Sequence, residues 1–187
     1  MRLPGMDFTY GGPYFLTICS ARRELVFGSI RDGHMNPNAL GRIVTREWNA
    51  LPQASPWVSL HILMVMPNHI HGILAIGWNE RERPLPTEPR PRLDRVVGAL
   101  KSRTTIAVNR VRGTPGASLW QRGYYEHIIR NERACEAIWH YIVANPANWK
   151  RDREYVEARP GRASPAPTES RSRDGDRGRR IPDPELL

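Results

Sequence analysis

Two strand-length apolar runs, separated by only two residues, constrain the fold of this 187-residue chain more than any other feature. Residues 58–66 and 69–76 are rich in β-branched and other apolar side chains, and the intervening Pro67-Asn68 is a turn signal. Runs joined this closely pair most readily with each other as an antiparallel hairpin. The sequence therefore predicts an antiparallel sheet, which the other elements must extend or cover.

The remaining apolar patterns predict two more strands and three helices. Strands are expected over residues 14–19 and 124–129, and helices over about 38–51, 93–108 and 131–145. Pro52 and Pro146 are expected to end the first and last of these helices. The order β-α-β-β-α-β, followed by a C-terminal helix, is the split arrangement of ferredoxin-like (RRM-like) α+β domains. We expect helices over one face of an antiparallel sheet.

Length and composition suit one domain with a tail. We expect a domain over residues 1–157, with 78–92 as an exposed Pro-rich loop and 158–187 as a disordered basic tail. The 28 Lys and Arg residues exceed the 19 Asp and Glu residues, giving a formal charge of +9. Such an excess favours a polyanionic partner, and arginine, the dominant cation here, binds phosphates well. Genomic base bias also enriches arginine, so charge by itself does not decide the partner.

Several classes of protein are disfavoured. Cys19 and Cys135 lie far apart and form no CxxC pattern, so neither a disulfide framework nor a cysteine zinc site is expected. The sequence shows no signal-peptide pattern and no apolar run approaching 18 residues. We expect a protein that is soluble, cytoplasmic, associated with the nucleoid and without a membrane partner.

Four residues form two pairs that could carry chemistry. His69 and His71 are two apart on a predicted strand, so both side chains project from one face and can share a divalent ion. Tyr141 and Asn145 are four apart on the last predicted helix, one above the other. Each pair has an ordinary alternative, because two strand histidines or a core tyrosine are common. A buried amide on an apolar stripe, however, needs a polar partner.

Three sequence blocks together resemble a known family. They are Met66–Gly72 (MPNHIHG), Leu119–Glu132 (LWQRGYYEHIIRNE) and Tyr141–Pro146 (YIVANP). The first is similar to the His-hydrophobic-His motif of the HUH single-tyrosine transposases. The other two are similar to the branch called REP-associated tyrosine transposases, named for repetitive extragenic palindromes. The blocks occur in the family's order, and the resemblance spans about residues 5–150.

The resemblance implies a site and a reaction. His69, His71 and Asn145 would bind Mg²⁺ or Mn²⁺, which would polarise the scissile phosphate. Tyr141 would attack the phosphorus of single-stranded DNA, giving a 5′-phosphotyrosine and a free 3′-hydroxyl that can later be rejoined. The substrate implied is hairpin-forming DNA such as REP palindromes. Relatives include monomers and homodimers, so the oligomeric state stays open.

Further residues are candidates for DNA contact. Arginine and lysine could bind phosphates, tyrosine could stack on a base, and histidine could do either. These candidates are Lys101, Arg103, Arg122, Tyr124, His127 and Arg130. The alternatives are ordinary: an arginine can simply solvate a surface, and one of the adjacent Tyr124 and Tyr125 normally faces the core.

Two other functions fit parts of the pattern. Ferredoxin-like sheets also bind nucleic acids without catalysis, so a non-catalytic nucleic-acid-binding protein derived from a transposase is the main alternative. A metal-dependent nuclease that uses water would not need Tyr141. The presence of His69, His71, Tyr141 and Asn145 together favours the tyrosine enzyme.

Overall fold

A computed structural model describes residues 13–77 and 89–157 of the chain. Its main sheet is antiparallel throughout and has the strand order β4–β5–β1–β6. These strands are β1 (Tyr14–Cys19), β4 (Val58–Val65), β5 (His69–Ile76) and β6 (Tyr125–Ile128). β1 lies beside β5, between the β4–β5 hairpin and the last strand, as in ferredoxin-like domains. The predicted α+β fold class is confirmed.

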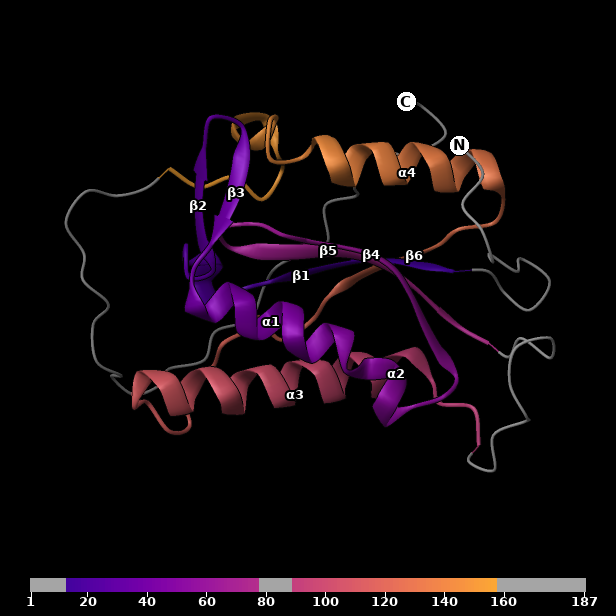
Figure 1. The fold of residues 1–187 in the computed structure, drawn as a ribbon, viewed down its shortest axis with the longest axis horizontal. Coiled ribbons are helices and arrows are strands. Elements are labelled where there is room, and N and C mark those ends of the chain that lie inside the picture. The colour runs from indigo at the N-terminus through magenta and orange to yellow at the C-terminus, as the bar shows by residue number, and fades with distance from the viewer. Residues whose placement is uncertain (1–12, 78–88, 158–187) are drawn as a thin grey trace.

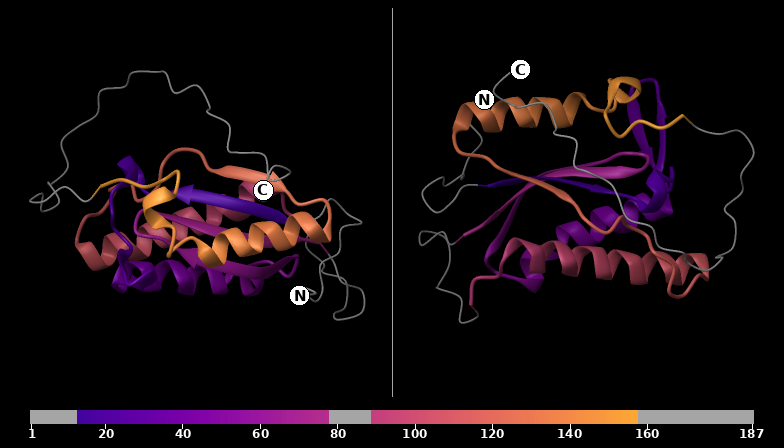
Figure 2. Two further views of the ribbon diagram at one scale, coloured as in Figure 1. Left: turned by 90° about the horizontal axis from the view of Figure 1, so that it is seen from above. Right: turned by 180° about the vertical axis from the view of Figure 1, so that it is seen from behind.

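Helices cover both faces of this sheet (Figures 1 and 2). α1 (Ala39–Asn49) and α3 (Leu93–Arg112) lie on one face, whereas α4 (Glu132–Ala144) lies on the other. A large apolar core fills the α1/α3 side and a smaller one fills the α4 side. The two helices of the βαββαβ unit, α1 and α3, thus share one face as expected, and the additional C-terminal helix α4 covers the other. Because the sheet is covered on both faces, alternate residues of each central strand enter different cores.

Local signals explain where the helices begin and end. Asn38 caps α1 by accepting hydrogen bonds from the backbone N–H groups of Leu40 and Gly41. Asn131 caps α4 by accepting from the N–H of Ala134. Pro52 does not end the first helix as predicted, because α1 stops at Asn49 and Pro52 lies in the first turn of a short α2 (Leu51–Ala54).

One hairpin was not predicted. β2 (Gly28–Arg31) and β3 (His34–Pro37) form a separate two-stranded sheet. Asp32 and Gly33 connect them with positive φ values of 49° and 74°. Asp-Gly is a signal for a tight hairpin turn, but the flanking residues alternate too weakly to be recognised as strands.

The expected tail, residues 158–187, and most of the expected Pro-rich loop, residues 78–88, lie outside the described residues. Two short 3₁₀ helices complete the part that the structure describes, namely Ala21–Arg23 and Trp149–Arg151. Within residues 13–77 and 89–157, no helix combines the length and the apolar character needed to cross a membrane.

Candidate active site

The two histidines of β5 lie together on the α4 side of the sheet. The Nε2 atoms of His69 and His71 are 3.0 Å apart. Both residues are buried, with exposed fractions of 0% and 2%. Ile70 between them packs into the core on the opposite face. The strand period of two thus places both imidazoles on one face, as the sequence predicts.

Contacts of the two Nδ1 atoms orient both imidazole rings so that their Nε2 atoms face each other. The Nδ1 atom of His69 is 2.8 Å from Asn68 Oδ1, and the Nδ1 atom of His71 is 2.9 Å from Thr17 Oγ1. With each Nδ1 occupied, each Nε2 is left to face the other ring. Two nitrogens bound at right angles to one ion, each about 2.1 Å from it, would lie about 3.0 Å apart. The spacing of the pair suits adjacent ligands of a single divalent cation.

A carboxylate that sequence reasoning missed completes the cluster. Asp152 follows the last 3₁₀ helix, and its Oδ2 is 3.8 Å from His71 Nε2. Candidate ligand atoms of His69, His71 and Asp152 all lie within 4.8 Å of one another. The Asp152 side chain is only 1% exposed. No motif marks this aspartate, because it lies in an irregular segment whose path depends on tertiary packing.

Tyr141 and Asn145 reach the cluster from α4. The Tyr141 hydroxyl is 3.5 Å from His71 Nε2 and donates to Asp152 Oδ2 at 3.3 Å. Asn145 Nδ2 donates to the same carboxylate oxygen at 2.6 Å. Asn145 Oδ1 is buried and has no hydrogen-bond partner among the described residues. An amide oxygen in that state is an available ligand for a cation.

The charges around the site favour cation binding. Burial, and then the neighbouring His71, hold the pKa of His69 well below its usual value of 6.5. Burial acts to raise the pKa of Asp152, but the hydrogen bond with His71 and the charge of His69 hold it well below normal. Burial, and then the charge of Asp152, raise the pKa of Tyr141. A neutral His69 imidazole and an ionised carboxylate are ready ligands, whereas the phenol needs nearby positive charge to ionise.

The segment after α4 covers the histidine pair. The rings of Trp149 and His69 have centroids 5.9 Å apart. The Glu154 carboxylate forms an ion pair with Arg23 Nη2 at 3.0 Å and accepts a hydrogen bond from Cys19 Sγ at 3.3 Å. Burial, and then the charge of Glu154, raise the pKa of Cys19 to about 12, so its thiol stays protonated. Among His69, His71, Asp152, Tyr141 and Asn145, only Tyr141 is substantially exposed, at 38%.

The two cations predicted on α3 lie on the other face of the sheet. Lys101 Nζ donates to the carbonyl oxygens of Gln121 at 2.6 Å and Gly123 at 3.1 Å. Arg103 Nε donates to the Glu47 carboxylate at 3.0 Å. Both side chains are engaged within the protein, and neither lies with the histidines.

The candidate residues around β6 divide between the two faces. Tyr125 packs against the core on the α4 side, whereas Tyr124 packs against the core on the α1/α3 side. Strand alternation puts His127 on the same face as Tyr125. Arg122 and Arg130 are exposed before and after the strand. Tyr125 therefore shares the face of the histidines, and the candidate DNA contact Tyr124 lies on the other face.

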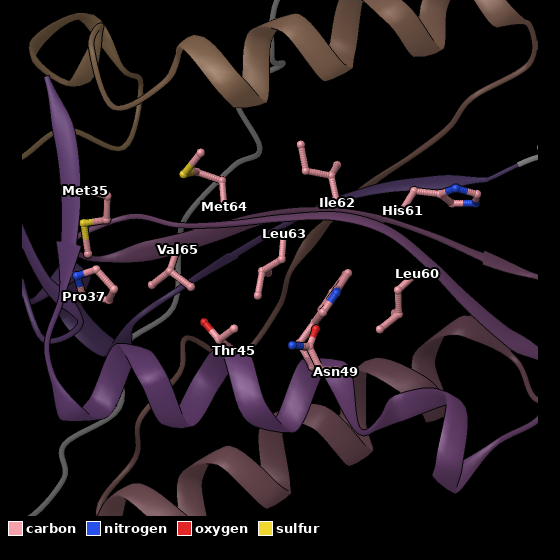
Figure 3. A pocket seen from close by; sticks show the side chains of 11 residues that line it. Met35, Pro37, Thr45, Asn49, Leu60, His61, Ile62, Leu63, Met64 and Val65 are labelled. Atoms are coloured by element: carbon pink, nitrogen blue, oxygen red, sulfur yellow. The ribbon is translucent and has the colours of Figure 1, made fainter. Parts of the chain in front are cut away.

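A separate hollow of about 480 Å³ runs along the edge strand β4 (Figure 3). It is lined mainly by apolar side chains of β4 and by residues of α1 and β3. Ile62 and Met64 point towards the α4 side, and Leu63 and Val65 point towards α1 (Figure 3). None of the residues around the histidine pair lines it, and its lining residues include no arginine or lysine.

Comparison with known proteins gives a relative and a solved structure. No protein-family model matches the sequence. The chain is 33% identical, over 166 residues, to an uncharacterized protein of Haemophilus influenzae, covering 84% of this chain and 92% of the relative. A solved structure of the REP-associated tyrosine transposase bound to a REP hairpin superposes with a TM-score of 0.54 and 19% identity. The match covers 80% of this chain and 74% of that one. At that identity the likeness establishes the fold.

Proposed function

We propose that this chain, which belongs to one family with the Haemophilus influenzae protein and has the fold of the REP-associated tyrosine transposase, cleaves and rejoins single-stranded DNA through Tyr141. One observation carries the proposal. A phenol hydroxyl from α4 lies 3.5 Å from a histidine pair on β5 and shares a carboxylate with an amide one helical turn away. A nucleophile beside a set of cation ligands is what metal-assisted phosphoryl transfer requires.

The residues present fit a divalent cation such as Mg²⁺ or Mn²⁺. His69 and His71 would supply nitrogen ligands, and Asn145 and Asp152 would supply oxygen ligands. The buried Oδ1 of Asn145, which has no hydrogen-bond partner within residues 13–77 and 89–157, supports its assignment as a ligand, which the family resemblance first implied. The ion would polarise the scissile phosphate and stabilise negative charge developing on its oxygens. Oxygen ligands beside imidazoles suit magnesium and manganese better than an all-nitrogen site would.

Tyr141 would act as the nucleophile. Its oxygen forms a bond to phosphorus while the bond from phosphorus to the 3′ oxygen breaks. The phenolic proton is lost to solvent, to which Tyr141 is exposed, and the departing 3′ oxygen takes up a proton. The product is a 5′-phosphotyrosine and a free 3′-hydroxyl. Because the covalent link replaces one phosphodiester with another, attack by a 3′-hydroxyl reverses the step without ATP.

The substrate that we propose is hairpin-forming DNA. The transposase with this fold was solved with a REP hairpin, and the charge of +9 on this chain suits a polyanion. We assign the catalytic domain to residues 1–157, with the basic segment 158–187 as an electrostatic contact to DNA. Arg122, Arg130 and His127 flank or lie on β6 and remain candidate DNA contacts.

The proposal is tested with a labelled hairpin oligonucleotide and Mn²⁺. We expect a protein–DNA adduct that survives denaturation and is absent in Tyr141→Phe. Tyr155→Phe is the matched control, because it removes the same hydroxyl from a tyrosine that packs on Trp149 near the site. If Tyr141→Phe forms the adduct at the normal rate, the nucleophile is misassigned.

A second variant tests the cation site. His69→Ala should lose cleavage and Mn²⁺ affinity together. A His69→Ala protein that retained both would show that the site is misplaced. Tight hairpin binding by the unmodified chain, with no adduct in any divalent metal, would instead favour the non-catalytic nucleic-acid-binding alternative.

A further inference from the structure

The side-chain amide of Asn68, the residue before His69, makes hydrogen bonds through both its nitrogen and its oxygen. Asn68 is fully buried, with an exposed fraction of 0%. Its Nδ2 donates to the carbonyl oxygen of Glu154 at 2.7 Å and to that of Arg23 at 3.3 Å. Its Oδ1 lies 2.8 Å from His69 Nδ1. The Asn68 side chain therefore links the turn between β4 and β5 to His69 and to the backbone of two other segments.

The polarity of these contacts determines which nitrogen of His69 carries a proton. Backbone carbonyl oxygens only accept hydrogen bonds, so the NH₂ group of Asn68 must face Glu154 and Arg23. The oxygen of the amide must then face His69, where it can only accept. His69 Nδ1 is therefore a protonated nitrogen, and in the neutral imidazole Nε2 keeps its lone pair. A bare Nε2 directed into the cluster is the state that a metal ligand needs.

The other histidine is held differently. The Thr17 hydroxyl beside His71 Nδ1 can either donate or accept, so it fixes no tautomer. The 3.0 Å contact between the two Nε2 atoms needs one proton. Because His69 Nε2 is bare, that proton lies on His71 Nε2 in the ion-free protein. His71 would then have to move its proton to Nδ1 when it binds a cation, with the Thr17 hydroxyl turning to accept.

We propose that Asn68 is a positioning residue that presets His69 as a metal ligand, and that the segment after α4 holds Asn68 in place through the Glu154 carbonyl. This inference rests on the cation site of the proposed function. Glu154 is itself fixed by its carboxylate, which contacts Arg23 and Cys19, and by its N–H, which donates to Asp152. One short segment thus supplies both the Asp152 carboxylate and the hydrogen bond that orients Asn68.

The tautomers can be read directly by NMR of the ¹⁵N-labelled imidazoles in the metal-free protein. The chain has six histidines, and single His→Gln variants assign the signals of His69 and His71. We expect the proton on Nδ1 of His69 and on Nε2 of His71. A wild-type His69 that carries its proton on Nε2 would overturn the inference. This measurement needs no DNA cleavage, so it stays informative even if the proposed function is wrong.

Substitution of Asn68 separates its two contacts. Asn68→Ala removes both, so His69 should lose its Nδ1–H preference and Mn²⁺ should bind about 10–100-fold more weakly, as for other outer-shell partners of histidine ligands. Asn68→Asp can still accept from His69 but cannot donate to Glu154. Asn68→Asp should therefore keep the His69 tautomer but weaken the attachment of the segment after α4 to Asn68.

The matched control is Asn109→Ala. Asn109 is also buried and its Nδ2 donates to the carbonyl oxygen of Ala117 at 2.8 Å, but it lies on α3, across the sheet from the site. Asn109→Ala should leave both the His69 tautomer and the Mn²⁺ affinity unchanged. It therefore controls for the general loss of a buried hydrogen bond. Equal Mn²⁺ affinities for Asn68→Ala and Asn109→Ala, measured by calorimetry, would overturn the proposal.

Discussion

Replacing Asp152 by asparagine should destabilise the protein even without any cation. Three donors converge on this carboxylate: Asn145 Nδ2 at 2.6 Å, the N–H of Glu154 at 2.6 Å and the Tyr141 hydroxyl at 3.3 Å. They approach both oxygens, so the amide that replaces the carboxylate must turn its NH₂ towards at least one donor. Leaving one buried donor without an acceptor costs about 1–3 kcal/mol. We therefore expect a loss of about 2 kcal/mol in the free energy of unfolding.

Urea unfolding followed by circular dichroism, at neutral pH and with EDTA present, measures this loss. With a slope of about 2 kcal/mol per molar urea, the midpoint should fall by about 1 M. Glu136→Gln is the control, since Glu136 is an exposed carboxylate of α4 whose Oε1 lies 4.0 Å from His140 Nε2, and its loss should change the free energy of unfolding by less than about 0.5 kcal/mol.

The pH dependence of Asp152→Asn gives a second check. Because the pKa of Asp152 is held below its ordinary value of 3.8, its contribution is present above that pH and disappears as the pH falls further. The difference between the two proteins should therefore be largest at neutral pH and should shrink below about pH 4. Equal urea midpoints at neutral pH would refute the contacts described for Asp152.

Three further predictions concern stability. Gly72→Ala should cost about 1–3 kcal/mol, because an added Cβ would collide with the buried Trp48 indole; an unchanged urea midpoint would contradict the packing of β5 on α1. Because the pKa of His69 is lowered, its contribution to the free energy of unfolding is fully present above pH 6.5 and declines below it, by up to about 1.4 kcal/mol per pH unit. A urea series from pH 7.5 to 5 should show a flatter pH dependence for His69→Gln, and equal slopes for the two proteins would contradict this reasoning. Lys101→Met should cost about 1–2 kcal/mol, because the ammonium binds backbone carbonyls; a loss below about 0.5 kcal/mol would suit a free surface cation instead.

Residues whose placement depends only on local periodicity were predicted correctly. The shared face of His69 and His71 follows from the strand period of two, and the alignment of Tyr141 with Asn145 follows from the helix period of 3.6. Asn131 marks the start of α4 because an N-cap is a local hydrogen bond. Features of this kind need no knowledge of which elements meet in space.

Residues placed by tertiary contacts could not be predicted in this way. Asp152 enters the site because Trp149 packs against His69 and the following segment turns back over the sheet, and no local pattern encodes that path. The sequence makes Lys101 a candidate DNA contact on a helix surface, but it does not reveal that its ammonium binds a carbonyl of a loop 20 residues later. Tyr124 and Tyr125 are chemically equivalent in sequence, and only the strand register decides which one faces the site.

Charge explains why the missed aspartate matters for the chemistry proposed. Two neutral imidazoles and an amide carry no net charge, so a divalent cation held by them alone would leave two positive charges in a buried site. Uncompensated buried charge is costly. The ionised Asp152 reduces the excess to one, and a substrate phosphodiester, with its single negative charge, removes the rest. Because the site reaches neutrality only when both the cation and a phosphodiester are present, these charges favour binding the two together. A histidine pair without Asp152 would lack that preference.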